Sequence, residues 1–253
     1  MNKEVKEQYE HFAKEALGFE YHDINLLITA LTHRSYVNEH KNSHAEHNER
    51  LEFLGDAVLE LVVSDFLYKN YDQPEGIMTA WRSALVRTDS ICDAGTKIGY
   101  APLIRLSNGE KSGSARAHEV IMADCFEAVI GSIYVDQGYE TARKFIEEHI
   151  LSKTETMIEE GTWRDPKSFF QEVTQHYDGV TPVYRTVKEE GPDHDKTFTV
   201  EVYVGRERRG TGEGHSKQEA QGKAAYDAIK YYRENYEDFD PVKLPTGSGG
   251  KHH

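Results

Sequence analysis

The chain has 253 residues, of which 38% are hydrophobic and 11% aromatic, so it can form buried cores and an intrinsically disordered protein is excluded. It has 44 Asp and Glu residues against 30 Lys and Arg residues, a formal net charge of −14 at pH 7. That charge excludes a uniformly basic nucleic-acid-binding protein, because cationic patches bind phosphates.

Cysteine content and hydropathy exclude further classes of protein. Cys92 and Cys125 provide neither a disulfide framework nor paired metal-ligand spacing. No segment approaches the roughly 20 apolar residues that span a bilayer, and the polar start MNKEVKEQYEHFAKE lacks the apolar run of a signal peptide. We therefore expect a soluble, cytoplasmic protein with no membrane partner.

The first part of the chain is predicted to be an all-α domain over residues 1–152. Its helical segments are LLITALTHRSY, RLEFLGDAVLELVVSDFLYKNY, GIMTAWRSALV, TDSICDAGTKIG and EVIMADCFEAVIGSIYVD, with short polar loops between them. A polar stretch, residues 153–164, then predicts a linker. Residues 236–253 are predicted to be an acidic, flexible tail, whose end GSGGKHH is typical of an added tag.

Residues 165–235 predict a small α+β domain in the order α-β-β-β-α. Asp165 as N-cap and Pro166 at the first helical position begin a helix. TPVYRTVKEE and KTFTVEVYVG alternate as strands around the turn sequence GPDHD, and ERRGTGEGH predicts a short third strand. Ser216 and Glu219 form a capping box at the last helix.

The segment NERLEFLGDAVLE (residues 48–60) places acids opposite an apolar stripe. The residues predicted to be buried are Leu51, Leu54, Ala57, Val58 and Leu61; the acids, within an arc of about 80°, are Glu49, Glu52, Asp56 and Glu60. A solvated face is one interpretation. Against it, the like-charge pairs at i,i+4 cost a few tenths of a kcal/mol each, with no compensating base on that face, and Gly55 in mid-helix costs about 0.5–1 kcal/mol.

A second segment, VIMADCFEAVIGSIYV (residues 120–135), has Asp124 and Glu127 as its only charged residues. They lie one turn apart, so they share a face of a helix that is otherwise apolar or small and is predicted to be buried. Carboxylates in such a place are costly unless paired or metal-bound. Salt bridges to bases are one solution, although two acids need more than one arginine.

A divalent cation is the alternative. Ligands that are all oxygen favour Mg²⁺ or Mn²⁺ over zinc. If Glu52 and Asp56 face the other two acids, two Mg²⁺ ions about 3.5–4 Å apart would cancel the four charges, an arrangement suited to phosphodiester hydrolysis. The residues thus predict a metal-dependent phosphodiesterase.

NERLEFLGDAVL resembles the signature of bacterial ribonuclease III, and the similarity runs from about Leu26 to Tyr232. ALTHRS, PEG, RSALV, EKSG and ADCFEAVIGSIYVD occur in the family's order. DPKSFFQE, GPDH and GEGHSK followed by AA resemble a double-stranded-RNA-binding domain.

The resemblance implies a homodimeric endoribonuclease of double-stranded RNA. It implies dependence on Mg²⁺, with Mn²⁺ as a substitute and no small-molecule cofactor, and products with 5′-phosphate and 3′-hydroxyl ends, in processing of ribosomal RNA precursors and turnover of messages. The implied metal ligands are Glu52, Asp56, Asp124 and Glu127, and the implied supporting acids are Glu49 and Glu75. Glu60 has no catalytic counterpart and is read as solvated. Phe53 matches a residue that enters a socket on the partner subunit.

The resemblance also implies an RNA-binding surface in the second domain. Its residues are Gln171, Glu172, Pro192, His194, Ser216, Lys217 and Lys223, with minor-groove contacts from the first helix and the turn and phosphate contacts from the lysines. The family has a second lysine where this chain has Gln218, and Arg206, Arg208 and Arg209 are the bases able to compensate. We therefore expect modest affinity, supported by avidity in a dimer.

Three alternatives stay open. A catalytically silent, dimeric scaffold that binds double-stranded RNA is disfavoured because it has no need for Asp124 and Glu127 in an apolar helix. A phosphohydrolase of small molecules is disfavoured by the appended domain. A separate metal site at His40, His44 and His47 lacks an anchoring strand or cysteine.

Overall fold

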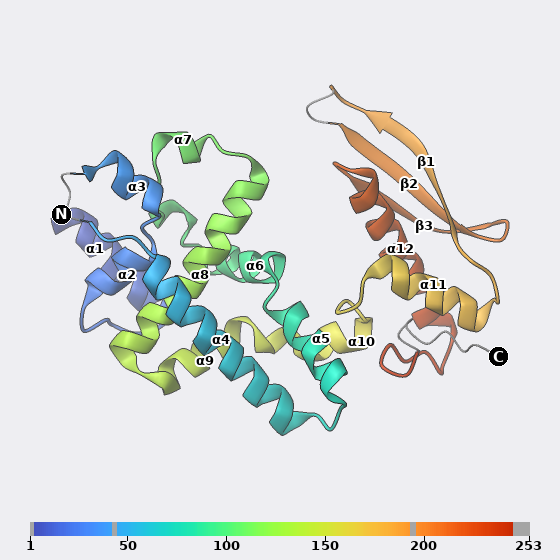
Figure 1. Ribbon diagram of the computed structural model, residues 1–253, viewed down its shortest axis with the longest axis horizontal. Helices are drawn as coiled ribbons and strands as arrows, with labels where there is room; N and C mark the ends of the chain where they lie inside the picture. The colour runs from blue at the N-terminus through green and yellow to red at the C-terminus, as the bar shows by residue number, and fades with distance from the viewer. Residues whose placement is uncertain (1–2, 42–44, 193–195, 245–253) are drawn as a thin grey trace. The chain divides into compact units, whose positions relative to one another are not determined.

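The computed structural model describes residues 3–41, 45–192 and 196–244 of the chain. The chain divides into two compact units, Met1–Thr154 and Glu155–His253, each with its own core (Figure 1). The first is helical and the second combines helices with a sheet, which confirms the predicted fold class. Within the described residues, no helix is both long and apolar enough to cross a membrane.

The first unit is built of helices joined by short loops. Its α-helices are α1 (Lys3–Phe12), α2 (Ile24–Ala30), α3 (Arg34–Glu39), α4 (Glu49–Asn70), α5 (Glu75–Leu85), α6 (Thr88–Ile98), α7 (Asn108–Lys111), α8 (Ala115–Gln137) and α9 (Tyr139–His149). A π-helical turn (Ala13–Leu17) and two 3₁₀ turns (Ala101–Leu103 and Leu151–Lys153) complete it. Helix α10 (Thr154–Glu160) begins at the boundary between the units.

Helices α4 and α8 form the centre of the first unit and pack on each other more extensively than any other pair of its elements (Figure 1). Helix α8 begins where the Ser114 side chain accepts a hydrogen bond from the Ala117 N–H, and it ends at Gly138 with φ +83°. Residues all round its middle are buried, as its apolar sequence predicts. On α8, Asp124 and Glu127 are half-buried among these residues.

The buried face of α4 differs from the predicted stripe. Its buried residues are Gly55, Val58, Leu59, Val62, Val63 and Leu67. Ala57 is exposed, and Leu61 has 57% of its surface accessible. The prediction was wrong for these two residues because the helix turns a second apolar face, which includes Phe53, away from the core of its own chain.

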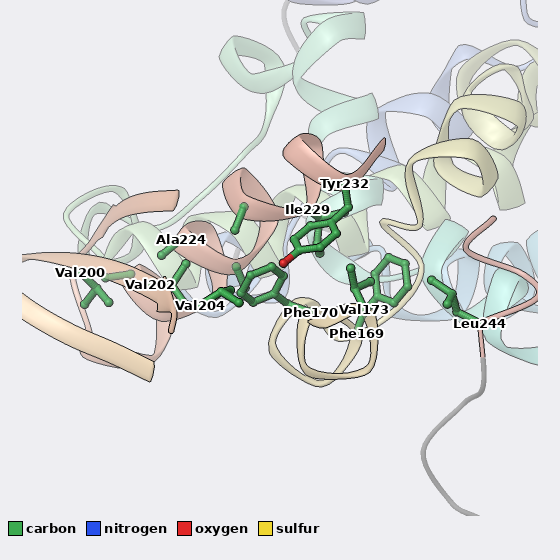
Figure 2. Packing of buried hydrophobic residues seen from close by; sticks show 13 residues of the cluster. Phe169, Phe170, Val173, Val200, Val202, Val204, Ala224, Ile229, Tyr232 and Leu244 are labelled. Carbon is green, nitrogen blue, oxygen red and sulfur yellow. The ribbon is translucent and has the colours of Figure 1, made fainter. Parts of the chain in front are cut away.

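The second unit has a three-stranded antiparallel sheet in the order β1 (Val183–Glu190), β2 (Thr197–Val204), β3 (Glu207–Gly214). Helices α11 (Pro166–Tyr177) and α12 (Lys217–Asn235) supply the rest of its core. Figure 2 shows Val200, Val202 and Val204 of β2 facing Phe170 and Tyr232, as strand alternation predicts. The caps at Asp165 and Ser216 are confirmed, since each side chain accepts a backbone N–H of its helix.

Strand β3 is as long as its neighbours rather than short. The glycines of β3 face α12 and leave room for it. A Cβ at Gly210 would lie 2.4 Å from the Ala224 carbonyl oxygen, and one at Gly212 would lie 2.3 Å from the Ala224 nitrogen. The glycines of β3 and the alanines of α12 thus let helix and strand approach closely.

The residues on both sides of the predicted second domain are more ordered than expected. The predicted linker contains α10, and the predicted tail packs on the core as far as Leu244, which is 5% exposed. Arg164 Nη1 donates to the carbonyl oxygens of Pro241 (3.2 Å) and Leu244 (3.3 Å), and Figure 2 shows Leu244 on the Phe169 side of the cluster. The apolar Phe239 and Leu244 anchor a segment whose composition suggested flexibility.

Candidate active site and RNA-binding surface

Two glycines bring the backbones of α4 and α8 into direct contact. A Cβ at Gly55 would lie 1.7 Å from the carbonyl oxygen of Glu127, and a Cβ at Gly131 would lie 2.1 Å from that of Leu51. No other residue has room at either position. The contact places Glu52 and Asp56, on either side of Gly55, beside the acids of α8.

The four carboxyl groups of Glu52, Asp56, Asp124 and Glu127 influence one another's ionisation. Burial, together with the charges of Asp56, Glu52 and Asp124, raises the pKa of Glu127 to about 8. Burial likewise raises the pKa of Glu52 to about 7, with contributions from Asp124, Glu49 and Asp56. The pKa of Asp124 is also raised by burial, an effect that the nearby His33 partly offsets. The structure thus brings together the acids that the sequence placed on two separate helices.

The donor set of this acidic cluster (Glu52, Asp56, Asp124 and Glu127) suits a hard divalent cation, because all its ligand atoms are carboxylate oxygens and a cation relieves their repulsion. Within residues 3–41, 45–192 and 196–244, no three His, Cys, Asp or Glu side chains converge tightly enough to form a finished metal-ligand group. The cluster therefore fits a cation in its charge and in the chemistry of its ligand atoms.

Several neighbours of the cluster were not assigned a role from the sequence. Asn48 is 1% exposed, and its Nδ2 donates to Cys125 Sγ at 3.7 Å. His33 caps α3, with its Nδ1 2.8 Å from Ser35 Oγ. An open cavity of about 430 Å³ beside the cluster is lined by His33, Glu110, Ser114, Arg116, Val120 and Asp124, among others. The motif ALTHRS contributes His33 to this cavity and the motif EKSG contributes Glu110. The sequence did not indicate that these two motifs lie together.

The remaining acids are placed differently. Glu49 begins α4, where Arg34 Nη1 lies 3.2 Å from its carboxylate. Glu75 begins α5 and accepts a hydrogen bond from Thr79 Oγ1; it is not among the charges that raise the pKa of Glu52 or Glu127. Glu60 is not simply solvated as expected, since Arg82 Nε lies 3.0 Å from its Oε2. Arg82, which compensates the charge of Glu60, belongs to α5. The sequence of α4 alone could not indicate this pairing.

Phe53 is 80% exposed on α4. Leu61 and Tyr68 of the same helix are 57% and 79% exposed, so three large apolar side chains are uncovered within one chain. This pattern is unusual for a surface that faces only water.

The predicted RNA-contacting residues of the second unit are only partly accessible. Gln171 and Pro192 are exposed, whereas Glu172 is half-buried and forms an ion pair with the buried Arg164. His194 lies outside the described residues. The minor-groove contact expected of Glu172 would therefore compete with a structural partner.

The lysines near the start of α12 also have partners. Lys217 Nζ lies 2.7 Å from Glu189 Oε1, and Lys223 Nζ lies 2.6 Å from Glu219 Oε1. Ser216 caps α12 and Gln218 is exposed. The strand arginines are engaged as well: Arg208 pairs with Glu201 at 2.9 Å and Arg209 pairs with Glu207, while Arg206 is exposed.

The histidine loop is divided in the structure. His40 stacks on Tyr36 with ring centroids 4.1 Å apart, and His47 Nδ1 lies 3.7 Å from Glu49 Oε2. His44 lies outside the described residues. Each described histidine of this loop thus has a local contact of its own.

Comparisons with known proteins agree with this geometry. Residues 23–154 match the family model described as ribonuclease-III-like, and residues 166–232 match the double-stranded RNA binding motif. The chain is 45% identical to Ribonuclease 3 of Enterococcus faecalis over 221 residues, which cover 86% of this chain and 94% of the relative.

Two further similarities cover different shares of the chain. Ribonuclease 3 of Oceanobacillus iheyensis is 41% identical over 217 residues, which cover 85% of this chain and 95% of that protein. A solved nuclease domain of ribonuclease III from Campylobacter jejuni is 35% identical and covers 55% of this chain and 97% of its own, with a TM-score of 0.49. The chain therefore belongs to the ribonuclease III family of endoribonucleases and carries a ribonuclease-III-like domain followed by a double-stranded-RNA-binding motif.

Proposed function

We propose that the chain cuts both strands of double-stranded RNA as a homodimer that depends on divalent cations, and leaves 5′-phosphate and 3′-hydroxyl ends. The observation that carries this proposal is the acidic cluster at the contact of α4 and α8, where carboxyl groups with raised pKa values crowd one another. Membership of an endoribonuclease family supports phosphodiesters as the substrate of this cluster.

In this proposal Glu52, Asp56, Asp124 and Glu127 hold Mg²⁺, or Mn²⁺ as a substitute, through carboxylate oxygens. Divalent ions at such a site neutralise charge and lower the pKa of an attacking water. The cavity lined by His33 and Arg116 lies beside the cluster, where the neighbouring part of the RNA strand can enter. Glu49 and Glu75 act as supporting acids near the scissile strand.

We assign the nuclease to residues 1–152 and the RNA-binding domain to residues 165–235. RNA contacts come from Gln171, Pro192, His194, Ser216, Lys217 and Lys223, with Glu172 available if it leaves Arg164. The uncovered Phe53 supports the dimer, because an apolar side chain that is 80% exposed gains from a second copy of the chain. Precursors of ribosomal RNA and structured messages in the cytoplasm are the proposed substrates.

The test is incubation of a long RNA duplex with the protein, with and without Mg²⁺, beside single-stranded RNA and duplex DNA. We expect only the RNA duplex to be cut, and only with the cation. The Glu127→Gln variant should bind the duplex and fail to cut it. Absence of cleavage by wild-type protein with Mg²⁺ would favour the catalytically silent scaffold, and normal cleavage by the variant would refute the assignment of Glu127.

A further inference from the structure

The two lysines assigned above to RNA phosphates are already paired within the second unit. Lys217 Nζ lies 2.7 Å from Glu189 Oε1, and Lys223 Nζ lies 2.6 Å from Glu219 Oε1. All four side chains are at least 40% exposed, so RNA can reach them. Each lysine thus has a carboxylate where a phosphate oxygen would bind.

The position of Lys217 is fixed by more than its charge. Its Nζ lies 5.4 Å from the centroid of the Phe198 ring. Phe198 on β2 is the strand partner of Glu189 on β1, so ring and carboxylate belong to adjacent strands at one end of the sheet. This end adjoins the turn that carries Pro192. Glu189 therefore holds Lys217 beside the predicted RNA-contacting turn.

Glu219 fills a second anion position. Its Oε2 accepts a hydrogen bond from the His215 N–H, and its own N–H donates to Ser216 Oγ. These groups form the N-terminus of α12, where a phosphate would otherwise find free backbone donors. Because Glu219 also stabilises the helix start, its replacement would mix two effects; Glu189, exposed on an edge strand, provides the cleaner test.

We propose that Glu189 is an affinity-determining residue that competes with RNA phosphate for Lys217. The inference rests on the proposed binding of double-stranded RNA and goes beyond it, because it assigns weakened binding to a carboxylate rather than to the absent lysine at Gln218. On binding, Lys217 exchanges the Glu189 carboxylate for a phosphate, and Glu189 is left to take up a solvent cation.

The ion pair lowers the pKa of Glu189, through the hydrogen bond from Lys217 and with a contribution from the charge of Lys196. Exposed ion pairs are individually weak, so the expected gain from removing Glu189 is about two- to fivefold in affinity. The gain shrinks as salt screens the pair. Uptake of a cation by Glu189 also makes wild-type binding less dependent on salt than that of a variant without this carboxylate.

The test is a titration of an RNA duplex with full-length protein in EDTA, over a range of salt concentrations, for wild type and Glu189→Gln. We expect about two- to fivefold tighter binding by the variant at low salt and a steeper dependence on salt. Glu190→Gln is the matched control, since it removes the same charge one residue away, where the partner is Lys188 at 2.8 Å. It should change affinity less.

A double-mutant cycle identifies the partner through which Glu189 acts. In a Lys217→Ala background, Glu189→Gln should give no gain, because the lysine that it releases is absent. A gain of the same size there, or equal gains from Glu190→Gln and Glu189→Gln, would overturn the proposal in favour of general repulsion. Unchanged affinity of Glu189→Gln would also refute it, whereas failure of wild-type protein to bind duplex RNA would refute the proposed function instead.

Discussion

At the scale of one residue, Glu127 supports the proposed cation site most directly. Its carboxyl group lies at the contact of α4 and α8, and burial together with four neighbouring carboxylates raises its pKa to about 8. Without a cation, the neutral acid is the favoured form at pH 7. With a cation, the charged form becomes favourable, so binding of the cation releases protons and strengthens as the pH rises.

This pKa predicts how the stability of the metal-free protein depends on pH. The pKa is about 8 in the folded chain against 4.5 for an unperturbed glutamate, so between these values the folded state binds more protons than the unfolded state. The free energy of unfolding should therefore fall as the pH rises from 5 to 8. Urea denaturation in EDTA should show this fall, and Glu127→Gln should flatten it. An equal slope in both proteins would show that Glu127 is not crowded.

Some residues of the site could be predicted from sequence and others could not. Asp124 and Glu127 stand out because they are the only charged residues in the apolar stretch 120–135. The pairing of Glu60 with Arg82 could not be predicted from the sequence, since it depends on how α5 packs on α4. His33 and Arg116 join the cavity through the tertiary fold, and no local pattern brings them together.

At the scale of elements, the contact of Gly55 with Gly131 sets the distance between the two carboxylate pairs. Each glycine lies against a backbone carbonyl of the other helix, at positions where a methyl group cannot fit. Gly55 is therefore not merely tolerated in mid-helix. Its cost in helix propensity is offset by close packing, which a residue with a side chain would prevent.

Gly55→Ala should force α4 and α8 apart. We expect a loss of about 1–3 kcal/mol in the free energy of unfolding, as for other overpacked interiors. Gly76→Ala is the matched control, because Gly76 lies in α5 with no atom within 4 Å of an added Cβ. Urea denaturation should show the control to be neutral or slightly stabilised. Equal stability of Gly55→Ala and wild type would refute the close contact.

Element boundaries were well predicted where local chemistry decides them. The caps at Asp165 and Ser216 and the alternation in β2 follow from neighbouring residues. The length of β3 and the packing of residues 236–244 were mispredicted, because both depend on distant partners. Gly212 is accommodated by Ala224, and Leu244 is held through Arg164.

At the scale of the whole molecule, the exposed apolar face of α4 makes the dimer a requirement of the proposed function. Phe53→Ala should weaken dimerisation at least tenfold, as for a central interface residue, while the monomer keeps its stability because the side chain is 80% exposed. Sedimentation over a range of concentrations measures the change. Val187→Ala in β1, half-exposed in the second unit, is the control and should dimerise normally. Wild-type dimerisation by Phe53→Ala would remove this residue from the interface.

The net charge of −14 is compatible with an RNA substrate when the charges of the two units are considered separately. In the proposed function, acids in the first unit supply the cation site, and cations carry the compensating charge that the chain itself lacks. The second unit carries Lys217 and Lys223 but keeps them paired with glutamates. Under this proposal, substrate binding draws on both domains, on two copies of the chain and on bound cations.

The central claim is that carboxylates from α4 and α8 jointly bind divalent cations, and titration calorimetry with Mn²⁺ tests it most directly. We predict saturable binding of about two ions per chain, tighter at pH 8 than at pH 6 and severely weakened in Glu127→Gln. Equal binding by wild type and this variant, or no binding by wild type, would contradict the account.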